Sequence, residues 1–254
     1  RAPDPVCIGD RDTWGGYRGV SPQAMQEMNQ DYRVPPQARP TMGSSLSYVG
    51  QMPGSNYGSS WPTTGYEWDA AATAPHVMTL TDIEAVINGH RTSARNVIEA
   101  GFDGLEVHLG HGHLLNQFLS PATNRRSDEF GGQESNRMRF PLQVLAAVRE
   151  EIGADVCMGI RISADEFVQG GLTLEDMCRI VPAITASVPV DFVNVSHSAY
   201  HGSYSLSTQI ADMSFDPNSF RHFAPQIRKS LRAAGQSLPV MAVCKFRSIS
   251  EAEE

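Results

Sequence analysis

The hydrophobic and polar positions of the chain follow two alternating periods from about residue 75 onward. Apolar residues recur at helical spacing between Thr79 and Gly101, where Thr79 and Asp82 predict a capping box and Gly101 predicts the end of the helix. A short strand pattern follows over 105–108. Further helices are predicted at 137–152, 173–184 and 220–233, and further strands at 156–163, 191–196 and 239–243. Strands separated by helices predict a parallel sheet with right-handed crossovers.

Residues 1–74 lack this periodicity and are rich in Gly, Pro and Ser. An irregular stretch of this length is unusual inside a compact domain. It is interpreted as an excursion between barrel elements, or as what is left of a barrel whose opening strands are absent. The sequence therefore divides into an irregular segment, 1–74, and a barrel portion, 75–254.

The chain length of 254 residues is close to the roughly 250 residues of one (β/α)8 barrel. The pattern yields only four credible strands, whereas a closed barrel of this type needs eight. The fold class expected from the sequence is accordingly α/β, a TIM barrel in partial form. Such an open sheet would leave strand edges unpaired.

Composition restricts the class of partner. The formal net charge of −8 argues against a nucleic-acid or anionic-membrane surface, because those surfaces attract clusters of Lys and Arg. The four cysteines are widely scattered, which is typical of reduced thiols in a cytoplasmic protein rather than of a disulfide frame or an iron–sulfur site. No apolar run reaches the roughly 18 residues of a membrane span. A small-molecule enzyme fits best, with its oligomeric state left open.

Three histidines, His108, His111 and His113, lie within six positions at the end of the first predicted strand. Catalytic residues of barrel enzymes occupy this end of the strands. From the spacing alone, a structural role, a metal site and metal-free catalysis all stay open. Zinc sites usually add a further His, Cys or carboxylate ligand at suitable spacing. Neither a Cys-x-x-Cys nor a His-Glu-x-x-His pattern lies nearby, so no metal is assigned.

A single arginine is expected on the inner face of the second strand. Alternation groups Cys157, Gly159 and Arg161 on one side of that strand, and Glu106 and His108 on one side of the first strand. An arginine that points into a barrel needs an anionic partner. From the residues alone, that partner is expected to be a carboxylate on a neighbouring strand.

The wider string around the histidines carries a family resemblance. It reads L-E-V-H-x-x-H-G-x-L-L-x-Q-F-L-S-P-x-x-N-x-R-x-D-x-F-G-G and is followed by N-R-M-R-F. It resembles the old yellow enzyme family of FMN-dependent oxidoreductases, including the 2,4-dienoyl-CoA reductase and trimethylamine dehydrogenase branches. The resemblance runs from about Pro75 to the C-terminus and implies a TIM barrel that holds FMN and takes electrons from NAD(P)H.

The resemblance also implies roles for individual residues. His108 and His111 would bind a substrate carbonyl oxygen, and His113, where the family often has tyrosine, would donate a proton. Arg161 would contact the flavin ring near N1 and O2. Other positions are assigned more loosely: Cys244 and Lys245 stand where the family has a Gly-Arg pair at the FMN phosphate, and His197, Tyr200 and His201 would line the substrate pocket.

The activity implied by this resemblance is reduction of an activated C=C bond of an unsaturated carbonyl compound. One alternative within the family is an oxidative N-demethylase or amine dehydrogenase. A second alternative is a non-catalytic fragment that lacks a complete FMN site, because the first, second and eighth strands of the family barrel are not recognisable in the sequence.

Overall fold

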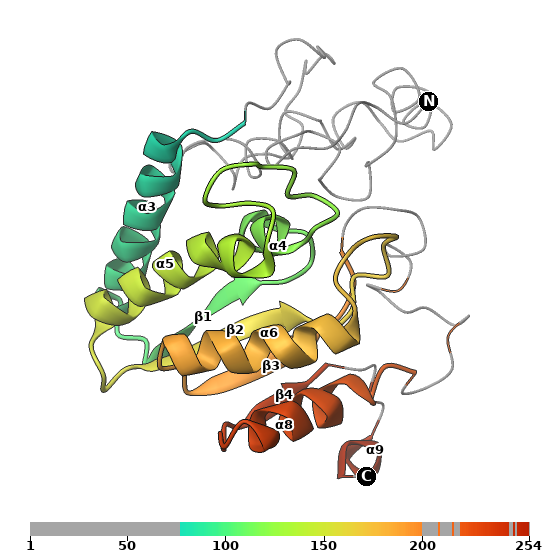
Figure 1. The fold of residues 1–254 in the computed structure, drawn as a ribbon. Helices are drawn as coiled ribbons and strands as arrows, with labels where there is room; N and C mark the ends of the chain where they lie inside the picture. Colours follow the sequence, from blue (N-terminus) through green and yellow to red (C-terminus); the bar gives the residue numbers. More distant parts are fainter. Residues whose placement is uncertain are drawn as a thin grey trace, which may run out of the picture.

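The computed structural model describes residues 77–199, 208, 215, 219–243, 246 and 248–253. These residues form consecutive strand–helix units (Figure 1). In chain order the elements are α3 (Leu80–Glu99), β1 (Gly104–Leu109), α4 (Leu114–Leu119), α5 (Glu134–Ile152), β2 (Cys157–Ser163), α6 (Leu174–Ser187), β3 (Phe192–Ser196), α8 (Phe223–Ala233), β4 (Val240–Ala242) and α9 (Ile249–Glu253). No helix among these is long and apolar enough to cross a membrane.

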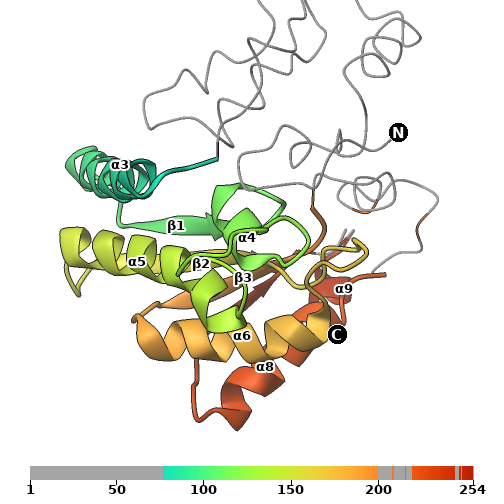
Figure 2. The ribbon, with the colours of Figure 1, turned by 45° about the horizontal axis from the view of Figure 1, so that its top comes forward.

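The four described strands form one parallel sheet in the order β1-β2-β3-β4. Sequential order with a helix after each of the first three strands is the arrangement of a (β/α)8 barrel wall. Figure 2 shows α3, α5, α6 and α8 along one side of this sheet. The predicted parallel α/β architecture is therefore confirmed for the described part of the chain.

The main core lies between the sheet and these helices. Strand residues Val107, Leu109, Met158, Ile160, Ile162, Val193 and Val195 are buried on the helix side. They pack in one cluster with apolar residues of the helices, such as Phe140 and Ile180. Burying each large apolar side chain stabilises the fold by about 1.5–3 kcal/mol. The alternate strand positions, which carry the polar residues, are thereby left on the other face of the sheet.

Helix starts follow the caps that the sequence shows. Thr79 and Asp82 cap α3 reciprocally, and Thr173 and Asp176 do the same for α6, as their side-chain and backbone hydrogen bonds show. The start of α5 was predicted wrongly at residue 137, because Gln133 caps the helix without a side-chain hydrogen bond. The short helix α4 was not predicted, since its six residues are all buried and carry no amphipathic period.

The strand register places three inner-face residues side by side. His108 of β1 pairs with Arg161 of β2, which in turn pairs with Asn194 of β3. One layer lower, Gly159 pairs with Phe192. A Cβ added at Gly159 would lie 2.1 Å from Cζ of Phe192, so the phenyl ring lies over the space that the glycine leaves. The inner face of the sheet therefore requires glycine at this position of β2, because a side chain there would overlap the Phe192 ring.

Gly159→Ala is expected to lower the unfolding free energy by about 1–3 kcal/mol, because the new methyl group overlaps the Phe192 ring. Urea denaturation of the purified protein measures the change. In the Phe192→Ala background, which lacks the ring, adding Gly159→Ala should lower the unfolding free energy much less than it does in the parent protein. Equal losses in both backgrounds would show that the ring does not oppose the methyl group.

Candidate functional site at the carboxyl ends of the strands

The site begins where β1 passes into its loop close to the end of β2. A Cβ added at Gly110 would lie 2.8 Å from the backbone nitrogen of Ser163. Only glycine allows the two backbones to approach this closely. The close approach brings the loop after His108 over the carboxyl ends of β2 and β3, where barrel enzymes carry their reactive groups.

His111 is held in the left-handed backbone region, with φ of 59°. This conformation is unfavourable for a residue other than glycine. Two contacts hold it: the backbone N–H donates to Oγ of Ser163 at 2.8 Å, and Nε2 of the ring lies 2.7 Å from Oγ of Ser196. An isolated parallel bridge to Ala199 adds a backbone restraint. The ends of β2 and β3 therefore fix both the backbone and the ring of His111.

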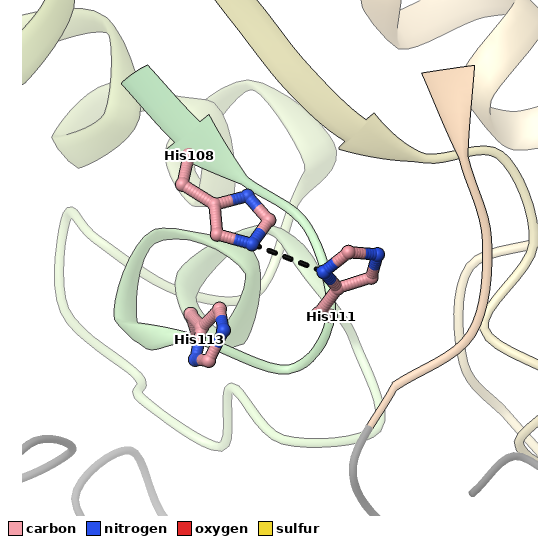
Figure 3. A group of neighbouring side chains, drawn as sticks. All are labelled: His108, His111 and His113. Atoms are coloured by element: carbon pink, nitrogen blue, oxygen red, sulfur yellow. Dashed lines mark hydrogen bonds between the residues drawn. The ribbon is translucent and has the colours of Figure 1, made fainter. Parts of the chain in front are cut away.

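A directed chain of hydrogen bonds links the first two histidines (Figure 3). The Gly110 N–H donates to Nδ1 of His108 at 3.3 Å, so this nitrogen is unprotonated. The proton of His108 then sits on Nε2, which lies 3.1 Å from Nδ1 of His111. Because Nδ1 of His111 accepts this hydrogen bond, the ring hydrogen of His111 is on Nε2, which donates to Ser196. The long Gly110 contact of 3.3 Å thus favours one tautomer of each ring, and a ligand that replaces this contact can reverse the direction of the chain.

The third histidine lies at the start of α4. His113 is the N-cap residue of that helix but makes no side-chain cap bond. Its ring centroid lies 4.7 Å from that of His108. The loop that carries it is fixed by Asn116, whose Oδ1 accepts from Gly112 N–H, and by Gln117, whose Nε2 donates to the Gly112 carbonyl. The buried amides of α4 thus hold the turn on which His113 sits.

All three imidazoles are neutral at pH 7. Burial lowers the pKa of His108 to about 4, with the charge of Arg161 as the second cause. Burial also lowers the pKa of His111 to about 2, helped by repulsion from His108 and His113. The pKa of His113 falls to about 3 for the same reasons, burial first and His108 second. The site is therefore lined by uncharged rings, each with one donor and one acceptor nitrogen.

Arg161 lies beside His108 on the inner face of the sheet. No ion pair joins Arg161 to a carboxylate within the part of the chain that the structure describes, and Glu106 instead accepts a hydrogen bond from Nδ2 of Asn194 at 2.8 Å. Among the described residues, nothing accepts a hydrogen bond from the buried Nε of Arg161. A buried guanidinium N–H without an acceptor is costly, so this position fits a ligand that brings an acceptor atom.

His197, predicted to line the substrate pocket, is buried in an aromatic cluster. Its ring lies 4.1 Å from that of Phe220 and 6.3 Å from that of Phe167, and Nε2 lies 2.9 Å from the Thr208 carbonyl oxygen. His197 thus packs among Phe167, Phe220 and Thr208, and its contact with a substrate stays a prediction. The other predicted positions, Tyr200, His201, Cys244 and Lys245, lie outside the described residues.

Sequence reasoning did not identify the serines that hold His111. Ser163 and Ser196 pair with each other in register at the ends of β2 and β3. The alternation of side chains along each strand could have identified them. Ser163 follows Arg161 on the inner face of β2, and Ser196 follows Asn194 on the inner face of β3. Small hydroxyl residues at the last inward position of two neighbouring strands are suited to orient a group from a third strand.

Comparison with known proteins places this arrangement in a family. The sequence profile of the NADH:flavin oxidoreductase / NADH oxidase family matches residues 46–254. The N,N-dimethylglycine/sarcosine dehydrogenase of Chromohalobacter salexigens is 44% identical over 147 residues, which cover 58% of this chain and 21% of that protein. The NADH oxidase of Thermoanaerobacter brockii is 36% identical over 182 residues, which cover 72% of this chain and 27% of that protein.

A solved structure agrees with the sequence matches. The complex of 2-naphthoyl-CoA reductase with 2-naphthoyl-CoA superposes with a TM-score of 0.63 and 28% identity, covering 71% of this chain and 26% of that one. The chain thus spans about a fifth to a quarter of the length of these relatives. With its parallel strand–helix units, its histidine loop and a profile match over 46–254, the chain belongs to the NADH:flavin oxidoreductase / NADH oxidase family, whose flavin-binding domain is a TIM barrel.

Proposed function

We propose that this protein is an FMN-dependent oxidoreductase that reduces the activated C=C bond of an unsaturated carbonyl compound with NAD(P)H. The observation that carries the proposal is the juxtaposition, in one strand register, of Arg161 with its unsatisfied Nε and of the neutral His108. Arg161 favours an anionic or acceptor-rich cofactor. His108 offers an uncharged hydrogen-bond donor to a substrate.

The residues that the structure describes fit a flavin. The buried Nε of Arg161 has no acceptor among them, and the N1 and O2 edge of a flavin ring supplies acceptor atoms that gain negative charge on reduction. A fixed positive charge at that edge stabilises the reduced cofactor. Arg161 is therefore the residue proposed to hold the ring.

A bound FMN would supply the hydride transfer between NAD(P)H and the β-carbon of the substrate. The chain's own residues supply orientation and charge. The N–H of His108, which now points to His111, would donate instead to the substrate carbonyl oxygen. His111 joins it as a second donor through Nδ1, which faces His108, when its ring proton moves to Nδ1 and the Ser196 hydroxyl donates to Nε2. The two donors then stabilise the negative charge that develops on that oxygen.

His113 is proposed to supply the proton that completes the reduction at the α-carbon. Burial keeps its imidazole neutral at pH 7, and a neutral imidazole is a weak acid. The negative charge that develops on the substrate would raise the pKa of His113, so that the ring takes up a proton from solvent and the resulting imidazolium gives that proton to the α-carbon. The ring lies 4.7 Å from His108, centroid to centroid, so the same substrate can contact both.

Oxidation of a small amine is a second candidate function, and the tautomer of His111 favours it. Nδ1 of His111 faces the site with its lone pair, because Nε2 donates to Ser196. A lone pair accepts a hydrogen bond from an amine N–H as readily as an N–H donates to a carbonyl oxygen. The similarity to N,N-dimethylglycine/sarcosine dehydrogenase supports the same reading.

An anaerobic bleaching assay separates these functions. Loss of the flavin absorbance on addition of NAD(P)H, followed by its return on addition of an enone, supports reduction of a C=C bond. Loss of absorbance on addition of a methylated amine alone supports amine oxidation. A purified protein that neither absorbs as a flavoprotein nor takes up added FMN would contradict both and favour a non-catalytic fragment.

Arg161→Ala is expected to weaken FMN binding and to lower the flavin reduction potential, because the reduced ring loses its nearest positive charge. Fluorescence titration with FMN and a spectroelectrochemical titration measure the two effects. Arg91→Ala is the matched control, since Arg91 pairs with Glu150 on the exposed side of the helices. An unchanged potential with FMN retained would contradict the proposed contact.

His108→Ala and His111→Ala are each expected to slow the oxidative half-reaction by about 10²–10³-fold, the usual cost of losing one preorganised donor to a developing oxyanion. Reduction of the bound flavin by NAD(P)H should change much less, since that step develops no charge on the substrate oxygen. Stopped-flow absorbance follows each half separately. Equal slowing of both halves would exclude the donor role.

The unfolding free energy is expected to fall as the pH falls from about 6.5 to about 4. Unfolded imidazoles titrate near 6.5, whereas His108 and His113 titrate at about 4 and about 3 in the fold. In this range the unfolded chain binds protons at these imidazoles and the native chain does not. The unfolding free energy therefore falls by up to about 1.4 kcal/mol per pH unit for each group. Urea denaturation across this range should show a shallower slope for His113→Gln.

A further inference from the structure

The three histidine rings of the site lie close enough together for small side-chain shifts to bring them onto one metal ion, on which two nitrogens bound at about 2.0–2.1 Å lie at most about 4.2 Å apart. One ring nitrogen of each of His108, His111 and His113 lies within 4.8 Å of those of the other two. The ring centroids are 4.7, 4.8 and 6.2 Å apart. Figure 3 shows the three rings as neighbours around the loop that follows β1. His113 therefore offers a third ligand beside His108 and His111.

The ring of His111 is already oriented as a ligand. A histidine that binds a metal usually donates its other ring N–H to a fixed acceptor, which sets the tautomer. Nε2 of His111 makes such a bond to Ser196, and Nδ1 faces the cluster. The backbone N–H of the same residue is anchored on Ser163. Both the position and the tautomer of this nitrogen are thus set in the absence of an ion.

His108 must change its tautomer to bind an ion through Nε2. Its proton would move to Nδ1 and break the bond from the Gly110 N–H. That bond is 3.3 Å long, beyond the roughly 2.7–3.2 Å of a well-formed N–H hydrogen bond, so its loss costs little. The hydrogen bond of 3.1 Å between His108 and His111 is replaced by two bonds to the ion.

The charge around the cluster limits the affinity. Arg161 lies next to His108 in register, and its guanidinium repels any cation at the rings. Neutral imidazoles nevertheless bind zinc through their lone pairs, and three histidines with a water in the fourth position form a known zinc geometry. Imidazole nitrogens also favour Zn²⁺ over Mg²⁺ and Ca²⁺, which prefer oxygen ligands. The ligand set therefore selects a zinc-like ion.

We propose that His108, His111 and His113 form a three-histidine site for Zn²⁺, with a fourth coordination position left open. The ion takes the same ring nitrogens that bind substrate in the proposed function. On that assumption, zinc competes with the oxidising substrate and acts as a reversible inhibitor. Zinc binding itself does not depend on the assumption, because the ligands are present without a flavin.

The first experiment titrates the flavin-free full chain with Zn²⁺ by isothermal calorimetry. His113→Ala and His111→Ala should each weaken binding by more than about 100-fold, beyond the roughly 10–100-fold that loss of an outer hydrogen-bond partner costs. Ser196→Ala should fall in that smaller range, and Ser196→Thr should retain binding. The exposed His222→Gln is the matched control and should bind as the parent does. Equal affinity of His113→Ala and the parent would overturn the site.

X-ray absorption at the zinc edge gives a test that does not depend on whether the variants fold. With one equivalent of Zn²⁺ on the parent protein, three imidazoles at about 2.0–2.1 Å are expected. One imidazole or none, or a sulfur ligand in their place, would overturn the site.

Arg161→Ala separates this proposal from the flavin proposal. Removal of the repelling charge should tighten Zn²⁺ binding several-fold, whereas FMN binding should weaken. Weaker Zn²⁺ binding in Arg161→Ala would contradict the placement of the ion beside this residue. In steady-state assays of the flavin-loaded protein, Zn²⁺ should raise the KM for the oxidising substrate and leave kcat unchanged. A fall in kcat alone would overturn the competition.

Discussion

The parallel register of β1, β2 and β3 is the constraint on which the site depends. Because the three strands run in the same direction, their carboxyl ends meet at one edge, and residues that are 35 and 85 positions apart in the sequence come into contact there. The register pairs His108 with Arg161 and Ser163 with Ser196. A shift by one residue in any strand would turn these side chains toward the helices. The buried apolar face prevents that shift, so core packing fixes the site indirectly.

Burial lowers the pKa values of the three histidines more than the charges of neighbouring residues do. Burial is the largest cause of the lowered pKa at each of the three rings, and the nearby positive charge of Arg161 acts in the same direction at His108. The imidazoles therefore act as neutral donors and acceptors over the physiological pH range. A neutral ring binds a carbonyl oxygen, an amine or a metal ion, depending on which tautomer it carries. The contacts with Ser196 and Gly110 favour one tautomer in the described arrangement, and a ligand can change it because the Gly110 contact is long and a serine hydroxyl both donates and accepts.

Arg161 and the histidine cluster make different demands on a ligand. The guanidinium, with its buried Nε lacking an acceptor among the described residues, favours an acceptor-rich or anionic group. Each neutral imidazole offers one donor and one acceptor nitrogen and carries no charge. In the proposed function the flavin ring lies on the arginine side, and the substrate or ion lies on the histidine side. The two proposed subsites then differ in charge, one being cationic and the other neutral.

The sequence by itself determined the order of elements, the parallel sheet and the three histidines. These follow from local signals: the reciprocal caps at Thr79 and Thr173, the alternation of each strand, and a histidine spacing within one loop. Helix α4 and the start of α5 carry no such signal, because their residues are buried or capped without a side-chain bond.

Only the tertiary structure decided what surrounds each reactive group. Nothing local to Arg161 shows that Glu106 bonds to Asn194 instead, and nothing local to His111 identifies Ser196 as its partner. The alternation of a strand fixes the face on which a side chain lies. The partner on that face depends on the register between strands, which packing of distant segments sets.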